Sequence, residues 1–317
     1  MQPMDLRGLS PAPVTAFHKD GSLDIDANLR IAKWLASFED VKSLVILGHA
    51  GEGTFLTADE RLELIRAYRD AVDIPIVAGI TGEGTKVAAE EARRSLDAGA
   101  TGALVYPNHG WLRFGFQKGA PQDRYKAIYE EGGLQTILFQ YPDATKASYD
   151  LDTQLAIAAQ PGCVATKNGV RNMKRWYTEI PELKKARPDL QILSCHDEWL
   201  LPTMFDVDGL LVGYGNIAPE LLIDLINARI RKAEEEGAFD NLPGAGKPLP
   251  PCDDPENAVF NRILKDNGAV PEAVSLMREM ARLREELRET ADRSERRRMM
   301  TELSMLEARL DRARRDR

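Results

Sequence analysis

Residues 74–106 read IPIVAGITGEGTKVAAEEARRSLDAGATGALVY and contain one complete repeat of a pattern that runs through most of the chain. The stretch begins with a short aliphatic run, residues 74–78, and ends with a second run, residues 102–106. Between the runs an apolar stripe recurs at helical spacing, formed by Ala88, Ala92 and Leu96 and followed by Gly99. Near-continuous apolar runs are typical of strands that are buried on both faces of a parallel sheet. The stretch therefore predicts one strand–helix–strand unit.

Similar apolar runs occur eight times in the first two-thirds of the chain. They cover residues 12–16, 43–47, 74–78, 102–106, 136–141, 163–167, 191–195 and 209–213. Most neighbouring runs are about 30 residues apart, which is the length of a strand–helix unit. The gaps carry helical patterns, and one helix is expected to start at Thr57, whose hydroxyl can form a capping box with Glu60. The pattern predicts an α/β fold, a (β/α)8 TIM barrel over residues 1–225, in preference to an open doubly wound sheet.

Charge is divided unevenly between two parts of the 317-residue chain. Residues 1–225 carry 23 Lys+Arg against 31 Asp+Glu, which accounts for the whole net charge of −8. Residues 226–317 carry 19 of each sign and are neutral although rich in charge. This step in composition indicates two unlike domains with a boundary at residue 225. The acidic first domain argues against nucleic-acid binding, because it would repel phosphates.

Composition and cysteine spacing exclude several other classes of protein. With 43% apolar residues the chain can bury a large core, so disorder is excluded. Cys163, Cys195 and Cys252 include no close pair, so neither a disulfide framework nor a Cys-rich zinc site is indicated. The first residues lack the pattern of a secretory signal, and no apolar run approaches the roughly 18 residues that span a bilayer. We therefore expect a cytoplasmic protein without a membrane partner.

The second domain, residues 226–317, is expected to be small, charged and all-α. Residues 237–251 are rich in Gly and Pro and are not expected to be helical. From residue 271 onward leucines and methionines recur in steps of three and four, and the charged residues 292–298 interrupt this apolar seam. The pattern predicts a helical hairpin or a broken coiled coil. It fits a solvated helix pair as well as a protein-interaction device.

Lys167 is the first candidate for chemistry, because it closes the run 163–167 at the end where barrel enzymes carry their active sites. A lysine flanked by buried strand residues is costly when charged, so burial lowers its pKa and frees the amine. A neutral amine in this place can form a Schiff base with a ketone. A structural role, or a role as phosphate ligand, is the alternative for a single lysine at a strand end.

A glycine-rich loop follows the second run and reads Gly-His-Ala-Gly-Glu-Gly-Thr over residues 48–54. Its glycines let the backbone approach a ligand closely, and free amides in such a loop can hold a carboxylate. A carboxylate cradle and an imine-forming amine are the two groups that a 2-keto acid requires. Alone, a glycine-rich loop is a weak signal.

With these residues in place, residues 6–225 resemble the dihydrodipicolinate synthase/N-acetylneuraminate lyase family of pyruvate-dependent class I aldolases. The segments that carry the resemblance are Pro13–Phe17 with Asp20 and Gly21, Gly48–Glu52, Lys167, and Gly213–Pro219. The resemblance implies a TIM barrel, homo-oligomers and a covalent imine on Lys167, with no metal and no cofactor. It also implies contacts to the 2-keto acid from eight residues. These substrate-binding positions are Gly48, Ala50, Gly51, Glu52, Phe139, His109, Leu211 and Gly213.

The chain departs from the family at the residues that transfer protons. The family loop reads Gly-Thr-Thr-Gly-Glu, and here His49 and Ala50 stand in place of its hydroxyl residues. The family's catalytic tyrosine falls on Phe139, which cannot transfer a proton. Tyr141 lies two residues further on and is expected on the same face of the strand, so it is the first substitute for the relay. His49 is the second, because imidazole titrates near neutral pH.

Two further departures concern the substrate. A second family tyrosine, lent by a neighbouring subunit, falls on His109, and the arginine that binds the aldehyde partner in dihydrodipicolinate synthases falls near Ala144. We therefore expect an enzyme that is not a dihydrodipicolinate synthase proper. Arg113 and Lys118 are further candidates for a substrate carboxylate, although solvated loop charges are the simpler interpretation.

The second domain carries a resemblance of its own. Residues 226–290 are similar to the uncharacterised conserved domain of DnaJ-like proteins, the DnaJ homologue subfamily C. The motif includes Glu236-Gly237-Ala238-Phe239-Asp240-Asn241-Leu242-Pro243-Gly244. This resemblance implies no known chemistry. A protein partner that binds through the C-terminal helices is the function it leaves open.

Three hypotheses follow. The first is a lyase that binds pyruvate or another 2-keto acid on Lys167, for aldol cleavage or condensation or for dehydration of a 2-keto-3-deoxy sugar acid. The second is a catalytically inactive barrel fused to a protein-interaction module, which Phe139 favours. The third is a metal-dependent aldolase with His196 and Asp197 as ligands.

Overall fold

The computed structural model describes residues 4–203, 207–224, 227, 299 and 306. The chain divides into two compact units, residues 1–245 and residues 246–317. The helical hairpin or coiled coil expected in the second domain lies outside the described residues. So do most residues of the DnaJ-like resemblance, and the fold below is that of the described part of the first unit.

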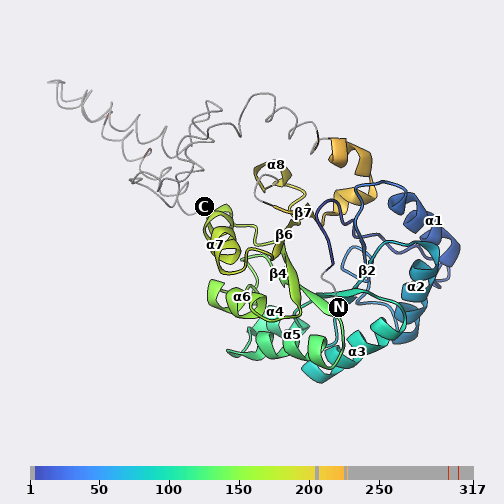
Figure 1. The fold of residues 1–317 in the computed structure, drawn as a ribbon, viewed down its shortest axis with the longest axis horizontal. Helices are drawn as coiled ribbons and strands as arrows, with labels where there is room; N and C mark the ends of the chain where they lie inside the picture. Colours follow the sequence, from blue (N-terminus) through green and yellow to red (C-terminus); the bar gives the residue numbers. More distant parts are fainter. Residues whose placement is uncertain (1–3, 204–206, 225–226, 228–298, 300–305, 307–317) are drawn as a thin grey trace. The chain divides into compact units, whose positions relative to one another are not determined.

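Seven parallel strands form one sheet in which every strand pairs with its neighbours in sequence. Their bounds are β1 Leu44–Ile46, β2 Ile76–Ile80, β3 Gly102–Val105, β4 Gln135–Gln140, β5 Cys163–Asn168, β6 Gln191–Ser194 and β7 Gly209–Leu210. Figure 1 shows the strands at the centre and helices around them. Each strand lies within or next to one of the predicted apolar runs, so the parallel sheet is confirmed.

The first predicted strand, residues 12–16, is wrong. The pairing lies earlier in the chain, where Leu9 bridges in parallel both to Val41 before β1 and to Leu210 in β7. Hydrogen bonds from Ser10 N to Leu210 O (2.7 Å) and from Val45 N to Pro11 O (2.9 Å) support these bridges. Prolines have no N–H to donate to a ladder, which explains why the pairing stops here. This short segment closes the sheet into a TIM-barrel-like fold.

Helices cover the outside of the barrel. Their bounds are α1 Ile25–Ala36, α2 Ala58–Ala71, α3 Thr85–Asp97, α4 His109–Phe114, α5 Ala120–Glu130, α6 Leu151–Ala158, α7 Met173–Ala186 and α8 Leu200–Thr203, with a 3-10 helix at Gly213–Asn216. The predicted capping box is confirmed, because Thr57 and Glu60 satisfy each other's backbone N–H groups at the start of α2. Residues 219–224 are helical as well. None of the helices described is both long and apolar enough to cross a membrane.

The apolar core has two layers, one between sheet and helices and one inside the barrel. In most strands the inner layer takes alternate residues, because successive side chains of a strand point to opposite faces. In β5 both Val164 and Ala165 belong to it, next to a register shift in the pairing of β5 with β4. Its strand members include Val45, Val77, Leu104, Ile137, Ala165 and Leu193. Lys167 follows Ala165 by two residues, so it lies on the same face of β5. Phe139 and Tyr141 follow Ile137 by two and four residues, so they continue the same face of β4. The alternation of the strands thus brings the candidate residues together at the carboxyl end of the barrel.

Candidate active site at the carboxyl ends of the strands

Lys167 lies on β5 with its neighbour in register, Phe139, on β4. Its Nζ atom lies 4.3 Å from the centre of the Phe139 ring. No residue of the described part forms an ion pair or a hydrogen bond with this amine. Burial lowers the pKa of Lys167, because the apolar walls of the barrel disfavour the charged form. The site therefore holds a buried amine whose charged form is disfavoured.

His49 and Tyr141 form a hydrogen-bonded pair next to this lysine. The His49 Nε2 and the Tyr141 hydroxyl oxygen are 2.6 Å apart. Burial raises the pKa of Tyr141 well above its usual value, so the phenol stays protonated at neutral pH. Burial, and next to it the charge of Lys167, lowers the pKa of His49. A neutral imidazole and a protonated phenol are the forms in which a proton can pass between the two.

Tyr106 is a third aromatic group in this cluster, and the sequence analysis did not select it. Its hydroxyl accepts a hydrogen bond from His49 N (3.2 Å), and its ring lies 4.6 Å from the imidazole and 5.2 Å from the Phe139 ring, centre to centre. Tyr106 closes the predicted run 102–106, so its place at a strand end was the available signal.

The glycine-rich loop is held in a tight, partly left-handed conformation. Leu47 and Glu52 have φ values of 60° and 52°, which is unusual for residues with a Cβ atom. A Cβ on Gly53 would lie 2.0 Å from the Leu47 carbonyl oxygen, so only glycine fits there. The Thr15 hydroxyl donates to Gly51 O at 2.6 Å. Thr15 belongs to residues 12–16, the segment that was predicted as a strand, and its hydrogen bond holds the loop in place.

The glycine-rich loop has an adjacent pair of backbone amides that are available to a ligand. The N–H groups of Ala50 and Gly51 have no hydrogen-bond partner among the described residues, whereas His49 N, Glu52 N and Gly53 N are all bonded. Adjacent free amides in a turn attract an anion. The Glu52 side chain is exposed at the edge of the loop.

Other predicted site residues are placed less centrally. His109 begins α4 and pairs through Nδ1 with Glu83 of the same chain at 2.5 Å, with both side chains more than half exposed. The expected role of His109 in a neighbouring subunit is not tested by a single chain. Leu211 is buried in the inner layer. Gly213 N donates to Asp197 Oδ2 at 3.2 Å.

The geometry gives no support to His196 and Asp197 as a pair of metal ligands. His196 is fully buried between two indole rings, and burial lowers its pKa to about 4. Asp197 accepts hydrogen bonds from the backbone of Gly213 and Tyr214. Among the residues that the structure describes, no three potential ligands gather around a common point.

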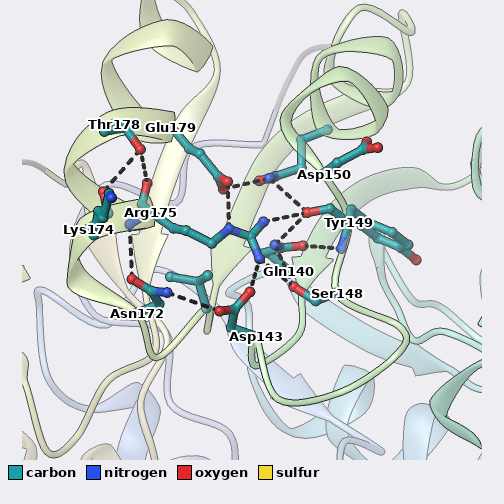
Figure 2. Close-up of polar contacts among 12 residues, drawn as sticks. Gln140, Asp143, Ser148, Tyr149, Asp150, Asn172, Lys174, Arg175, Thr178 and Glu179 are labelled. Atoms are coloured by element: carbon teal, nitrogen blue, oxygen red, sulfur yellow. Dashed lines mark hydrogen bonds and ion pairs between the residues drawn. The ribbon is translucent and has the colours of Figure 1, made fainter. Parts of the chain in front are cut away.

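A network around Arg175 of α7 fixes the loop between β4 and α6, which starts at Tyr141 (Figure 2). The guanidinium donates to Glu179 Oε1 (2.7 Å), Ser148 Oγ (2.9 Å) and Tyr149 O (2.6 Å), and it pairs with Asp143. Such fork-shaped donors bind several acceptors in a fixed plane. The loop is therefore attached to α7 along most of its length.

Gln140 attaches the same loop to the end of the strand. Its side-chain amide donates to Tyr149 O (2.9 Å) and accepts from Tyr149 N (3.0 Å). Gln140 directly precedes Tyr141, so the far end of the loop is bound to the residue next to the phenol. The sequence showed the polar residues of this segment but not their long-range partners.

Known proteins resemble this chain in sequence and in fold. A 4-hydroxy-tetrahydrodipicolinate synthase from Haloarcula marismortui is 32% identical over 236 residues, which cover 73% of this chain and 74% of the relative. The probable 2-dehydro-3-deoxy-D-pentonate aldolase YjhH from Escherichia coli is 28% identical over 228 residues, which cover 70% of this chain and 73% of the relative. Among solved structures, that of YagE is similar in fold. YagE is a prophage protein of the dihydrodipicolinic acid synthase family from E. coli, and its structure was solved in complex with pyruvate. The TM-score is 0.66 at 22% sequence identity, and the match covers 83% of this chain and 99% of YagE. This last likeness supports the barrel fold.

Two family models match the chain. The conserved domain of DnaJ homologue, subfamily C, member 28, matches residues 225–288, as the resemblance of the second domain implied. The other model matches residues 5–241, which include the barrel, the glycine-rich loop and Lys167. By this match and by the relatives above, the chain is a member of the dihydrodipicolinate synthetase family, whose members are lyases of the class I aldolase type.

Proposed function

We propose that this protein is a lyase that forms a Schiff base between Lys167 and a 2-keto acid. The observation that carries the proposal is the unpaired amine of Lys167, with its lowered pKa, beside the hydrogen-bonded pair of His49 and Tyr141. Membership of a family with aldolase relatives supports it.

The 2-keto acid binds with its carboxylate on the free N–H groups of Ala50 and Gly51, which presents its carbonyl carbon to the Lys167 amine. The neutral amine attacks that carbon, and loss of water gives an iminium ion. This cation withdraws electrons from the adjacent carbon, so a carbanion formed there is stabilised as an enamine. No metal and no cofactor is needed for these steps.

Tyr141 and His49 transfer the protons. The Tyr141 phenol donates a proton to the carbinolamine oxygen as water leaves, which leaves a phenolate. When the iminium ion then loses a proton from its adjacent carbon to form the enamine, the pair takes that proton up, on the phenolate oxygen or, along the 2.6 Å hydrogen bond, on His49 Nε2. Phe139 lines the site beside both groups instead of acting as the acid, because its ring lies next to the Lys167 amine and to the Tyr141 ring.

The substrate is a 2-keto-3-deoxy sugar acid or a related compound that is cleaved, condensed or dehydrated. Two differences argue against synthesis of dihydrodipicolinate. Phe139 replaces the family's catalytic tyrosine, and Ala144 in the exposed loop after β4 offers no guanidinium to an aldehyde partner. Assembly into a homo-oligomer, and a protein partner for the C-terminal helices, stay predictions.

Borohydride trapping tests the proposal. The protein is incubated with pyruvate and borohydride, and the intact mass and the modified peptide are measured. We expect a reduced pyruvyl adduct on Lys167, lost in Lys167→Ala and kept in Lys126→Ala, which removes an exposed lysine of α5. If pyruvate, 2-oxobutyrate and 2-keto-3-deoxy acids all give no adduct on the folded protein, the inactive barrel with an interaction module is the better account.

A further inference from the structure

Tyr106 directly follows β3, and its side chain belongs to the layer inside the barrel. Only 3% of the residue is exposed. Its ring lies 5.2 Å from the Phe139 ring, centre to centre, and the Lys167 amine lies 4.3 Å from the centre of that same ring. Tyr106 therefore lines the candidate site, although the proposed function gives it no task.

The glycine-rich loop leaves room for the Tyr106 hydroxyl. A Cβ atom on Gly48 would lie 2.6 Å from the hydroxyl oxygen, so the phenol occupies space that only a glycine leaves open. The backbone of Tyr106 is fixed as well. Its N–H donates to Ile80 O (3.0 Å), and its carbonyl oxygen accepts from Nε of the buried Arg124 (3.0 Å). The hydroxyl is thus held in one place against the loop.

The Tyr106 hydroxyl has a proton to donate. Its oxygen accepts the hydrogen bond of His49 N at 3.2 Å, and no described residue accepts a hydrogen bond from it. A buried donor without an acceptor is costly, so a ligand oxygen that accepts this proton gains stability. The hydrogen bond from His49 N also polarises the phenol and strengthens it as a donor. Burial raises the pKa of Tyr106, so the hydroxyl keeps its proton at neutral pH.

We propose that the Tyr106 hydroxyl donates a third hydrogen bond to the substrate carboxylate, beside the N–H groups of Ala50 and Gly51. The inference rests on the proposed function, which places the carboxylate on those two amides. Successive backbone nitrogens are at most about 4 Å apart, so Ala50 N lies within about 7 Å of the hydroxyl that bonds His49 N. The two oxygens of one carboxylate can bridge two donors at this separation, one oxygen on each.

A packing role for the phenol is the alternative, and the two roles differ in what they predict. A phenol that only supports the loop affects every ligand of the site alike. A phenol that donates to the carboxylate affects ligands with a charged carboxylate more than their neutral analogues, because hydrogen bonds to ionised acceptors are stronger. The charge of the ligand is therefore the variable to change in the test.

The test is borohydride trapping over a range of concentrations of pyruvate and of its methyl ester, which has no charged carboxylate. Tyr106→Phe removes only the hydroxyl and should raise the half-saturating concentration of pyruvate about tenfold, since a hydrogen bond to a charged group is worth about that factor. The half-saturating concentration of methyl pyruvate should rise much less, and the trapping rate at saturating pyruvate should change little. Tyr68→Phe, which removes a hydroxyl of α2 in the outer layer, should change neither concentration. Melting curves establish that each variant is folded.

Calorimetric binding of L-lactate separates this inference from the proposed function, because lactate has the carboxylate but no keto group and forms no imine. Tyr106→Phe should weaken lactate binding about tenfold as well. A selective loss of lactate binding in Tyr106→Phe, without any pyruvate adduct in the wild type, would retain the carboxylate contact and reject the Schiff base. An adduct on Lys167 whose half-saturating pyruvate concentration is unchanged in Tyr106→Phe would do the reverse. Equal losses for pyruvate and its methyl ester, or a wild type that binds neither pyruvate nor lactate, also overturn the inference.

Discussion

The Tyr141 hydroxyl and the His49 imidazole are 2.6 Å apart although 92 residues separate them in the chain. The phenol comes from the end of β4 and the imidazole from the loop after β1. This contact joins the two residues that the sequence offered as separate substitutes for a proton relay. It places a phenol two residues beyond Phe139, the position on which the family's tyrosine is expected to fall.

Substitution of either member of the relay should slow proton transfer about 100-fold, because both are needed for one step. The reaction to measure is exchange of the pyruvate methyl protons in D2O, followed by NMR, which needs no second substrate. Tyr141→Phe, His49→Gln and the double variant should show similar losses, because the two residues act as a unit. Tyr68→Phe, on α2, removes a hydroxyl of the outer layer as control. Additive losses would contradict the relay.

The exchange rate should fall at acid pH with the titration of His49. Burial and the charge of Lys167 lower the pKa of His49 from its usual 6.5, so its neutral form persists below that pH. The rate should therefore stay constant down to about pH 6.5 and decline only below it. In His49→Gln the remaining exchange rate should no longer decline as the pH falls below 6.5. A midpoint above 6.5 would mean that another group controls the step.

Gly48→Ala should destabilise the protein by about 1–3 kcal/mol through overpacking. A Cβ at this position would lie 2.6 Å from the Tyr106 hydroxyl oxygen but 3.7 Å from Tyr106 Cζ. Tyr106→Phe removes the oxygen and leaves ordinary contact distances. The double variant should therefore recover most of the stability lost by Gly48→Ala, as measured by urea unfolding. Equal free energies of unfolding for Gly48→Ala and the double variant would show that the hydroxyl is not the obstacle.

Much of the barrel could be predicted because each strand–helix unit is encoded locally. The run 74–78 and the stripe that follows it contain their own signals of strand and helix, and the same holds for Thr57 and Glu60. Closure of the barrel could not be predicted in this way. Closure depends on the parallel bridges of Leu9 to Val41 and to Leu210. No local sequence pattern distinguishes the segment around Leu9 from the apolar residues 12–16 that follow it.

The candidate site shows the same division. Lys167, Phe139 and Tyr141 could be placed from strand alternation, because their faces follow from a period of two. The contact of His49 with Tyr141 and the position of Tyr106 depend on loop conformations set by Leu47, which no composition rule describes.

Arg175→Ala should cost about 3 kcal/mol of stability, because it leaves Glu179 with an uncompensated, largely buried charge. Loosening of the loop between β4 and α6 should also lower the methyl exchange rate, since that loop starts at Tyr141. Hydrogen–deuterium exchange should increase over residues 143–150 and not over α2. Arg175→Lys keeps the charge without the fork, so it should recover stability in part. Unchanged protection of the loop would show that Gln140 alone holds it.

Lys167→Met should stabilise the protein at neutral pH by about 1–2 kcal/mol, because it replaces an amine enclosed by apolar walls with an isosteric apolar side chain. The pKa of Lys167 in the folded protein lies below its usual 10.5. Between the lowered pKa of Lys167 in the folded protein and its usual pKa of 10.5 in the unfolded chain, the unfolded chain binds more protons than the folded one. The free energy of unfolding of the wild type therefore rises with pH in that window. The advantage of the variant should therefore be largest at pH 7 and should shrink as pH approaches 10.5, as measured by urea unfolding at each pH. Lys126→Met, which changes an exposed lysine, should show no such trend. A variant less stable than the wild type at pH 7 would mean that the folded protein stabilises the charged amine, contrary to the nucleophile proposed for this site.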